Sequence, residues 1–428
     1  MTSVSDRSAA QEPIASPTPL HLGLLGLGTV GGAVARLSRA DARLFQSRDI
    51  APVVTAALVR DAARPRPASE LTALLTSDIE RFFAAPIDVV VEALGRAEPA
   101  RTLVARALDA GIPVVTANKT LIAAHGDELL DLARRRGTIL RYEATCIAGV
   151  PFLGTFERRP FARRVRAVTG ILNGTSNAIL SALAAGSTFP DALADAQRRG
   201  LAEPDPSADI TGADAAQKLT ILVRLFGGLR VSPAVIPSTP LDAVDVLDVG
   251  AARVFDGYVK PLACASWNGS GVRAFVSPAF VDGHHPLARV SNVINGVVLD
   301  AHGGPQCFIG PGAGPDVTAS TLLDDVIEVA AQRSAVASIT GTTLAATVSH
   351  PETRWFVRMP GGARQPDVAD LLGSFGIWCE RLSAVGDRTY ALTFAATRDR
   401  MAAATAALAS VTSGGIAAIP ALTGEASC

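Results

Sequence analysis

Short apolar runs alternate with helical stretches through the first third of the chain. The apolar runs are residues 20–25, 53–59, 88–95 and 112–119. Their continuous hydrophobicity is typical of strands that are buried on both faces of a sheet. Between them, residues 33–37 and 99–110 have apolar positions at helical spacing. Strands that alternate with helices predict an α/β fold with a doubly wound parallel sheet.

The middle of the chain has strand-like runs with few helices between them. The first covers residues 165–172, and a turn at residues 173–177 leads from it into a helix at 178–185. Three more runs follow, at residues 259–267, 272–276 and 293–300. Successive strands without intervening helices predict a mainly antiparallel sheet, so this part belongs to the α+β class.

From about residue 354 the elements become short and regularly spaced. The pattern predicts a strand, a helix, two strands, a helix and a strand, at residues 355–359, 368–374, 378–384, 389–396, 401–410 and 415–420. This β-α-β-β-α-β order is that of a ferredoxin-like module. Such modules more often regulate or oligomerise than catalyse, which is an argument by analogy of fold.

These patterns divide the 428 residues into a tail and three domains. Residues 1–19, rich in serine, alanine and proline, are expected to be a disordered tail. The doubly wound domain takes residues 20–145 and is completed by 305–335, and the α+β domain takes 146–304. The ferredoxin-like module takes 350–428.

Composition narrows the functional classes. Lysine and arginine number 39 against 40 aspartates and glutamates, so the net charge of −1 argues against a nucleic-acid partner. The five cysteines are scattered and form no CxxC pair, which argues against a disulfide framework and a zinc site. No signal peptide or long apolar run is visible, so we expect a cytoplasmic protein without a membrane partner.

A glycine-rich turn joins the first predicted strand to the first helix. It reads Gly26-x-Gly28-x-Val30-Gly31 and has the G-x-G-x-x-G spacing. In a Rossmann-type domain these glycines permit a tight turn and let a dinucleotide pyrophosphate approach the helix N-terminus. Glycine-rich turns are common, but the flanking strand and helix favour a site for NAD or NADP.

Two other strand ends face the expected ligand crevice. Residues 53–59 end in Arg60-Asp61, where an acidic residue favours NAD and an arginine accommodates the 2′-phosphate of NADP. The cofactor preference therefore stays open, and Arg60 is either a phosphate ligand or an exposed loop charge. Residues 112–119 end in Asn118-Lys119, which places Lys119 near the nicotinamide and substrate unless it is a solvated turn charge.

A carboxylate-rich loop at residues 199–213 leads into a predicted helix at 214–223. Asp214 and Lys218 are spaced i,i+4, so they share one face of that helix. Carboxylates here would bind the ammonium group of an amino acid, and the lysine would reach its reacting oxygen. Spacing alone fits an ordinary surface ion pair as well.

Lysine is rare in this chain. Arginine supplies almost all positive charge, and lysine occurs only at Lys119, Lys218 and Lys260. A lysine kept against that bias indicates a position where arginine will not serve, because lysine can lose its proton when partly buried. Lys119 and Lys218 are therefore candidates for proton transfer.

Two further loops are candidates for ligand contacts. The side chains and amides of residues 173–177, which include Asn173 and Thr175, either cap the next helix or bind a carboxylate. A second glycine loop at residues 310–314 precedes a predicted helix at 318–333. That loop either returns to the nucleotide site or is a plain linker.

From residue 20 to the C-terminus, these motifs in this order resemble homoserine dehydrogenase. The resemblance is carried by Gly26-x-Gly28-x-Val30-Gly31, Ala117-Asn118-Lys119, Glu143-Ala144-Thr145, Asn173-Gly174-Thr175-Ser176-Asn177, the stretch from Gly200 to Leu219, and Gly310-Pro311-Gly312-Ala313-Gly314. It implies NAD(P)-dependent interconversion of L-homoserine and L-aspartate 4-semialdehyde, in threonine and methionine biosynthesis. It also implies a homodimer or higher homo-oligomer, and an ACT-like C-terminal domain that senses an amino-acid effector.

The resemblance also implies roles for individual residues. Lys218 is the expected acid–base residue, Lys119 orients the substrate hydroxyl, and Asp214 serves both catalysis and binding. The implied substrate contacts are Gly200, Glu203, Asp209, Asp214, Asn173 and Thr175. The implied cofactor contacts are Gly26, Gly28, Thr29, Val30, Gly31, Arg60, Leu94, Asn118, Lys119 and Gly312. The implied ligands of a monovalent cation, such as sodium, are Glu143, Cys146, Ala148 and Val150.

Three positions depart from the family pattern and suggest other hypotheses. Ile147 replaces a glycine of the cation segment, where a left-handed backbone would strain a branched side chain. Leu201 and Ala178 replace tyrosines, and with Ile147 they would reshape the pocket for another amino-acid semialdehyde. A third hypothesis is a catalytically silent, nucleotide-binding sensor of amino acids. A silent protein has no reason to hold Lys119, Glu203, Asp214 and Lys218.

Overall fold

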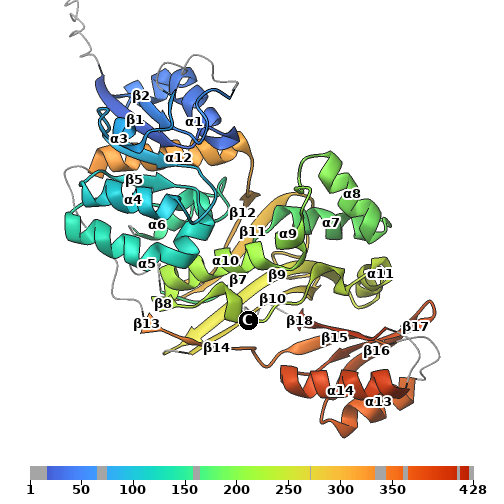
Figure 1. Cartoon of the computed structure of the whole chain (residues 1–428). Helices are drawn as coiled ribbons and strands as arrows, with labels where there is room; N and C mark the ends of the chain where they lie inside the picture. Colours follow the sequence, from blue (N-terminus) through green and yellow to red (C-terminus); the bar gives the residue numbers. More distant parts are fainter. Residues whose placement is uncertain are drawn as a thin grey trace, which may run out of the picture.

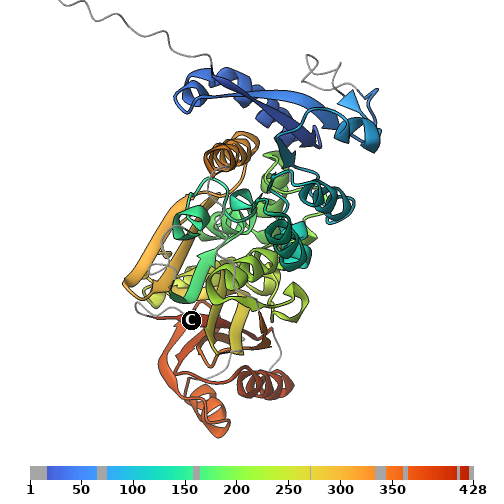
Figure 2. The ribbon, with the colours of Figure 1, turned by 90° about the vertical axis from the view of Figure 1, so that its left-hand side faces the viewer.

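The computed structural model describes residues 17–64, 75–157, 164–269, 271–332, 344–359, 365–411 and 415–423. Two sheets dominate it, one at the N-terminal end and a larger one that runs into the C-terminal module (Figure 1). In the view turned by 90°, the N-terminal sheet and the C-terminal module lie at opposite ends of the molecule (Figure 2). Most of the predicted tail at residues 1–19 lies outside the described residues.

The N-terminal sheet is parallel and has the order β3-β2-β1-β4-β5-β6. Its strands are β1 (Thr18–Leu25), β2 (Ile50–Leu58), β3 (Leu75–Thr76), β4 (Val89–Glu92), β5 (Val114–Thr116) and β6 (Leu140–Arg141). This is the strand order of a doubly wound dinucleotide-binding fold, so the predicted Rossmann-type domain is confirmed. The apolar runs predicted these strands because their residues are buried on both faces.

Helices cover both faces of this sheet. They are α1 (Thr29–Ala40), α2 (Ala42–Gln46), α3 (Ile79–Phe83), α4 (Ala100–Asp109) and α5 (Lys119–Arg136). A later helix, α12 (Pro315–Gln332), returns to pack beside α1 and buries Leu322 and Val326 against Leu22 and Leu24. The chain therefore leaves this domain after β6 and comes back to it through α12.

The larger sheet has ten strands, in the order β12-β11-β7-β9-β10-β18-β15-β17-β16 with β14 (Thr347–Ser349) beside β10. Its central strands are β7 (Val165–Ile171), β9 (Gly257–Asn268), β10 (Gly271–Asp282), β11 (Ile294–Ala301) and β12 (Gly304–Pro311). Neighbouring pairs among these five are antiparallel, which confirms the predicted α+β domain. The first part of the second glycine loop lies in β12, a strand that the sequence analysis did not predict.

The helices of this domain pack on and beside its sheet. They are α6 (Leu153–Glu157), α7 (Gly174–Ala184), α8 (Phe189–Arg198), α9 (Ser207–Ile210), α10 (Ala213–Leu222) and α11 (Val246–Val254). A short π-helix at Val223–Gly227 continues α10. Short 3-10 turns lie at Glu143–Thr145, Pro233–Val235 and Leu241–Ala243, and β8 (Leu229–Arg230) pairs with β13 (Leu344–Ala345).

The C-terminal module has the predicted β-α-β-β-α-β order. Its elements are β15 (Arg354–Met359), α13 (Gln365–Ser374), β16 (Cys379–Val385), β17 (Arg388–Thr393), α14 (Arg398–Val411) and β18 (Ala417–Leu422). Its strands pair in the order β18-β15-β17-β16, all antiparallel, so the ferredoxin-like fold is confirmed. β18 also pairs with β10, which joins the module to the larger sheet and was not predicted from sequence.

Two helix starts differ from the sequence prediction. Lys119 begins α5 and does not end a strand, and α7 begins at Gly174, so residues 174–177 form its first turn. In both places an asparagine side chain caps the helix, and hydrophobic periodicity does not show a cap. The helices α5, α8 and α11 were not predicted. Among the described residues, no helix is long and apolar enough to cross a membrane.

Candidate active site

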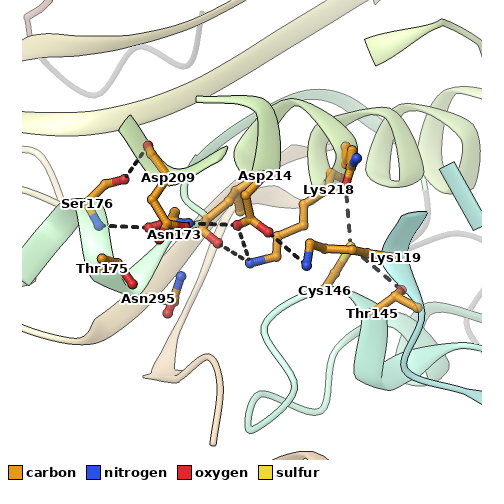
Figure 3. Close-up of polar contacts among 12 residues, drawn as sticks. Lys119, Thr145, Cys146, Asn173, Thr175, Ser176, Asp209, Asp214, Lys218 and Asn295 are labelled. Atoms are coloured by element: carbon orange, nitrogen blue, oxygen red, sulfur yellow. Dashed lines mark hydrogen bonds and ion pairs between the residues drawn. The ribbon is translucent and has the colours of Figure 1, made fainter. Parts of the chain in front are cut away.

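Asp214 occupies the centre of a buried group of charges. It is the second residue of α10, and its side chain is 8% exposed. Its Oδ2 lies 2.8 Å from Nζ of Lys218, and its Oδ1 lies 3.1 Å from Nζ of Lys119. Figure 3 shows the two ammonium groups converging on this carboxylate. The i,i+4 pair is thus buried, unlike the exposed pair that its spacing also allowed.

The two lysines decide the charge state of Asp214. Burial by itself raises the pKa of this carboxyl, but the charges of Lys218 and Lys119 outweigh burial and hold the pKa well below its usual range. Asp214 is therefore ionised at neutral pH and fixes both ammonium groups in place.

Lys218 lies one turn further along α10, and its side chain reaches the end of β7. Its Nζ donates to the backbone carbonyl of Leu172 at 2.8 Å as well as to Asp214. Within the described part of the chain these are its two acceptors. Since an ammonium group has three N–H bonds, one remains to donate to a substrate oxygen.

Lys119 comes from the other domain, at the first position of α5. The preceding Asn118 caps this helix, because its Oδ1 accepts the N–H of Leu121 at 3.0 Å. The Nδ2 of Asn118 donates to Oε1 of Glu92 at 3.2 Å and to the carbonyl of Arg96 at 2.7 Å. These bonds fix the turn between β5 and α5 and so position Lys119 opposite Asp214.

Glu92 anchors that turn from the end of β4. Its carboxyl also accepts the hydroxyl of Thr116 and the N–H of Leu94, the latter at 2.7 Å. Burial raises the pKa of Glu92, although these hydrogen bonds oppose the shift. Glu92 was not among the predicted site residues, even though an acidic residue at the C-terminal end of a parallel strand is a signal for the ligand crevice.

Asn173 connects the cap of α7 to two carboxylates. Its Oδ1 accepts the N–H of Ser176 at 2.7 Å, and its Nδ2 donates to Asp209 at 2.7 Å and to Asp214 at 2.9 Å. Burial raises the pKa of Asp209, against the effect of the Asn173 hydrogen bond. No lysine lies within ion-pair distance of Asp209 among the described residues, so this carboxylate is available for an ammonium group.

Other residues of the acidic loop lie further from this group. Gly200 has a φ of 69° just after α8, a left-handed turn that suits glycine. The hydroxyl of Thr175 donates to the carbonyl of Leu201 at 2.7 Å and ties α7 to the loop. The side chain of Glu203 is exposed, and among the described residues no ion pair joins it to the Asp214 group.

The glycine-rich turn before α1 has the geometry that a pyrophosphate requires. Gly26 has a φ of 97°, and a Cβ at Gly31 would lie only 2.2 Å from the carbonyl oxygen of Gly26. A Cβ at Gly28 would meet no atom of the described residues within 4 Å, so the space beside this turn is open. No side chain caps α1, and its first turn has no acidic residue. Its N–H groups therefore fit a bound phosphate.

The remaining predicted cofactor contacts are more dispersed. Thr29 and Arg60 are exposed, while Val30 and Leu94 are half-buried. Gly312 packs against Asn295, since a Cβ there would lie 2.0 Å from its Oδ1. The carbonyl of Gly312 accepts the N–H of Ala148, so the second glycine loop lies against the predicted cation segment.

That cation segment is tightly packed. The carboxylate of Glu143 accepts the N–H groups of Phe152, Leu153 and Gly154. Ile147 has a φ of 51°, so the left-handed backbone forms here despite the branched side chain. The carbonyl of Ala148 accepts the hydroxyl of Thr321.

The other predicted ligands of this segment add no anionic group. The Cys146 thiol is buried, which raises its pKa to about 12, so it is not a thiolate. The N–H of Val150 donates to the carbonyl of Ile147 at 2.9 Å. Among the described residues, no three His, Cys, Asp or Glu side chains form a metal cluster. Sodium at Glu143, Cys146, Ala148 and Val150 stays a prediction.

Comparisons with known proteins cover both domains. Residues 26–143 match the family "Homoserine dehydrogenase, NAD binding domain", and residues 151–327 match the family "Homoserine dehydrogenase". The chain is 36% identical to a homoserine dehydrogenase of Lactococcus lactis subsp. lactis over 316 residues, which is 72% of this chain and 74% of that protein.

Solved structures of homoserine dehydrogenases are also similar to this chain. A homoserine dehydrogenase from Thiobacillus denitrificans superposes with a TM-score of 0.83 at 30% identity, covering 95% of this chain and 99% of that one. A hyperthermophilic archaeal homoserine dehydrogenase in complex with NADPH has a TM-score of 0.62 at 25% identity, over 74% of this chain and 98% of that one.

Proposed function

This chain belongs to the homoserine dehydrogenase family, and on that premise we propose which of its residues carry out the reaction. It is an NAD(P)-dependent oxidoreductase that interconverts L-homoserine and L-aspartate 4-semialdehyde, a step of threonine and methionine biosynthesis. The observation that carries the residue assignment is the convergence of Lys119 and Lys218 on the buried carboxylate of Asp214.

We propose that the ammonium group of homoserine binds between Asp209 and Asp214. Both carboxylates accept hydrogen bonds from one Nδ2 of Asn173, which holds them side by side. Asp209 has no lysine partner in the described structure. The ammonium group of a bound substrate would give this carboxylate a cationic partner. That Glu203 also binds this ammonium group stays a prediction. Gly200 and Thr175 shape this loop, and their contact with substrate stays a prediction.

We propose that Lys218 is the acid–base residue. The Leu172 carbonyl and Asp214 direct its Nζ, and its remaining N–H donates to the substrate oxygen. When the aldehyde is reduced, Lys218 gives a proton to the forming alkoxide, and in the reverse direction it takes the hydroxyl proton. Lys119 stabilises the negative charge of that oxygen. When bound, the nicotinamide supplies the hydride or accepts it.

The nucleotide would be held by Gly26, Gly28, Thr29, Val30 and Gly31 at the N-terminus of α1. Arg60 and Asp61 follow β2 on the same edge of the sheet, so they would set the preference between NADP and NAD. We propose contacts from Leu94, Asn118 and Gly312 on the grounds of the family resemblance. Assays with each cofactor separately measure the preference.

The test of the catalytic assignment is replacement of Lys218. We expect Lys218→Ala to lower homoserine turnover by roughly 10²–10⁴-fold, the range for a general acid–base residue. Lys218→Arg keeps the charge but cannot release its proton, so we expect it to be similarly impaired. Turnover is followed by the absorbance of the reduced nicotinamide, with NAD and NADP in separate assays.

A matched control is Arg199→Ala. Arg199 forms the same kind of i,i+4 pair with Asp195, at 3.4 Å, but on the exposed surface of α8. This variant should keep wild-type turnover. Near-native turnover in Lys218→Ala would contradict the assignment of Lys218 as the acid–base residue. The membership of the chain in the family does not depend on that assignment.

The oligomeric state and the effector are further proposals. We propose that the chain forms a homodimer or higher homo-oligomer in the cytoplasm, and that its ferredoxin-like module is an ACT-like domain that binds an amino-acid effector. The ferredoxin-like strand order supports this proposal. Sedimentation measures the assembly state, and titration with threonine at fixed homoserine measures inhibition.

A further inference from the structure

A cavity of about 390 Å³ lies beside the first half of β9, apart from the Asp214 group. It is lined by α7, α11, β9 and the loop before β11, and α7 and α11 lie close to the same end of β9 (Figure 1). α7 supplies Ser181 and Ala184 from its C-terminal end, while Asn173 of the active site caps its N-terminal end. The cavity is therefore separate from the catalytic group and has no part in the reaction described above.

The cavity has an unbalanced charge. Three cations line it, namely Arg253 of α11, Lys260 of β9 and Arg289 of the loop before β11. The other lining residues are apolar or neutral, and none is an aspartate or glutamate. In the part of the chain that the structure describes, none of the three cations forms an ion pair with a carboxylate. Lys260 is buried while Arg253 and Arg289 are exposed to solvent, so the buried ammonium group is the charge that a bound anion would stabilise most.

Lys260 is the strongest single observation. It is 6% exposed, and its Nζ donates to the carbonyl of Val290 at 2.6 Å, which uses one of its three N–H bonds. Nζ lies 5.6 Å from the centroid of the Tyr258 ring, and the guanidinium of Arg253 stacks 3.6 Å from the same centroid. One tyrosine thus holds two cations near each other. Burial and the charge of Arg253 lower the pKa of Lys260 to about 8.

We propose that this cavity is a binding site for a small organic or inorganic dianion, whose phosphate or carboxylate oxygens are bound by Arg253, Lys260 and Arg289. Guanidinium groups bind phosphates and carboxylates in two-pronged geometry, and the lysine adds a point charge at the buried end. Apolar side chains such as Leu180 and Val249 would pack against a carbon skeleton. The volume is within the range of natural small-molecule pockets.

The test is calorimetric titration of inorganic phosphate, and separately of succinate, into the full chain saturated with NADP. Saturation fills the nucleotide site, so that phosphate cannot bind there. We expect at least one of the two dianions to bind, and the one that binds identifies the kind of oxyanion. Arg253→Gln and Arg289→Gln should each weaken binding by about tenfold or more, the loss of a charge-assisted hydrogen bond.

Two controls make the result specific. Arg198→Gln removes an exposed arginine that is already paired with Asp195 at 2.9 Å, and it should bind as the wild type does. Homoserine turnover in dianion-free buffer should be unchanged in all three variants, which shows that they are folded. Both arginines are exposed, and only Arg253 stacks on Tyr258, so the Arg289 variant still tests the site if Arg253→Gln fails to fold.

Two outcomes would overturn the proposal. One is that neither dianion binds the wild type below about 10 mM, the weak end of specific affinity. The other is that both arginine variants bind as tightly as the wild type.

Discussion

Asp209 and Asp214 share one hydrogen-bond donor, but the two lysines paired with Asp214 leave the carboxylates in different electrostatic states. Nδ2 of Asn173 donates to both carboxylates. Only Asp214 has ammonium groups beside it, so its pKa is lowered, while burial raises the pKa of Asp209. An ionised Asp214 therefore stabilises the empty site, whereas an ionised Asp209 costs stability until a substrate ammonium group reaches it.

We expect Asp214→Asn to lose stability at pH 7 and Asp209→Asn to lose none. The lowered pKa of Asp214 contributes stability above its unfolded value near 3.8 that is lost as the pH falls. The raised pKa of Asp209 contributes stability below about 3.8 that is lost as the pH rises through the folded value.

Urea unfolding at pH 7 should find Asp214→Asn weaker than the wild type by about 1–3 kcal/mol, the cost of unpaired buried groups. Asp209→Asn should be as stable as the wild type or more so. The deficit of Asp214→Asn should narrow below pH 4, roughly where the unfolded carboxyl takes up its proton. A shift of the same sign in both variants would contradict this account.

Lys260 makes a separate prediction at alkaline pH. Its pKa falls from 10.5 to about 8 on folding, under burial and the charge of Arg253, with Arg289 and Tyr258 also facing the cavity. Between these two values the unfolded chain binds more protons, so stability should rise with pH. Relative to Lys260→Met, which cannot titrate there, the wild type should gain up to about 3 kcal/mol between pH 8 and 10.5.

Urea unfolding of the wild type and of Lys260→Met between pH 8 and 10.5 measures this gain. If the difference in unfolding free energy between the two proteins does not change with pH, the prediction is wrong. Saturating phosphate should flatten the rise, because a bound dianion favours the charged form of Lys260.

At the scale of elements, an asparagine cap follows each of the two strands that position the site. Asn118 caps α5 after β5, and Asn173 caps α7 after β7. Each cap fixes where the helix starts, and with it the direction of Lys119 or of the amide that binds Asp209 and Asp214. Both asparagines thus stabilise a helix and shape the site at once.

Replacing Asn173 separates these two roles. Asn173→Ala removes the cap and the amide donor, so we expect a stability loss of about 0.5–2 kcal/mol together with a large loss of turnover. Asn173→Asp keeps a capping oxygen but adds a carboxylate beside Asp209 and Asp214. We expect it to keep most of the cap energy and still lose turnover through a raised KM for homoserine. Equal stability loss in both variants would show that capping is not separable here.

Much of the fold and part of the candidate site could be predicted from the sequence, and the features that could not depend on tertiary packing. The strands around residues 20–25 and 88–95 were predictable because burial on both faces makes them continuously apolar. The spacing of Asp214 and Lys218 placed them on one helix face. Spacing could not show that Lys119 arrives from another domain, or that Leu172 supplies a backbone acceptor, because both depend on tertiary packing.

At the scale of the whole molecule, the C-terminal module is part of the larger sheet. β18 pairs with β10 through Phe280 and Ala421, and Phe280 also stacks on Phe356 of β15 at 5.4 Å. The order of elements inside the module was predictable because it depends on local pattern. Its fusion to β10 was not, because that pairing joins distant parts of the chain.

Charged side chains of the module also hold α11 at both ends. Arg358, Arg388 and Tyr390 bind Asp245 and Asp248 at its N-terminus. At its C-terminus, Arg381 donates to the carbonyls of Val254 and Phe255. α11 also lines the proposed dianion cavity through Val249 and Arg253. The module, α11 and the cavity are therefore one connected structure.

The ion pair between Arg358 and Asp248 tests how firmly the module is attached. The side chain of Asp248 is 3% exposed and that of Arg358 is 15% exposed, so removing the arginine leaves a buried carboxylate short of its partner. Arg388 remains 3.4 Å from Asp248, so we expect Arg358→Met to cost up to about 3 kcal/mol, the low end for a broken buried pair. Arg354→Met is the control. Arg354 pairs with Glu380 inside the module, and both side chains are partly exposed to solvent. An ion pair of this kind contributes about 0–1 kcal/mol to stability. Urea unfolding combined with limited proteolysis measures the effect. In Arg358→Met the module should detach, and become open to proteolysis, before the larger sheet unfolds. Equal losses of unfolding free energy in the two variants would mean that β18 alone holds the module in place.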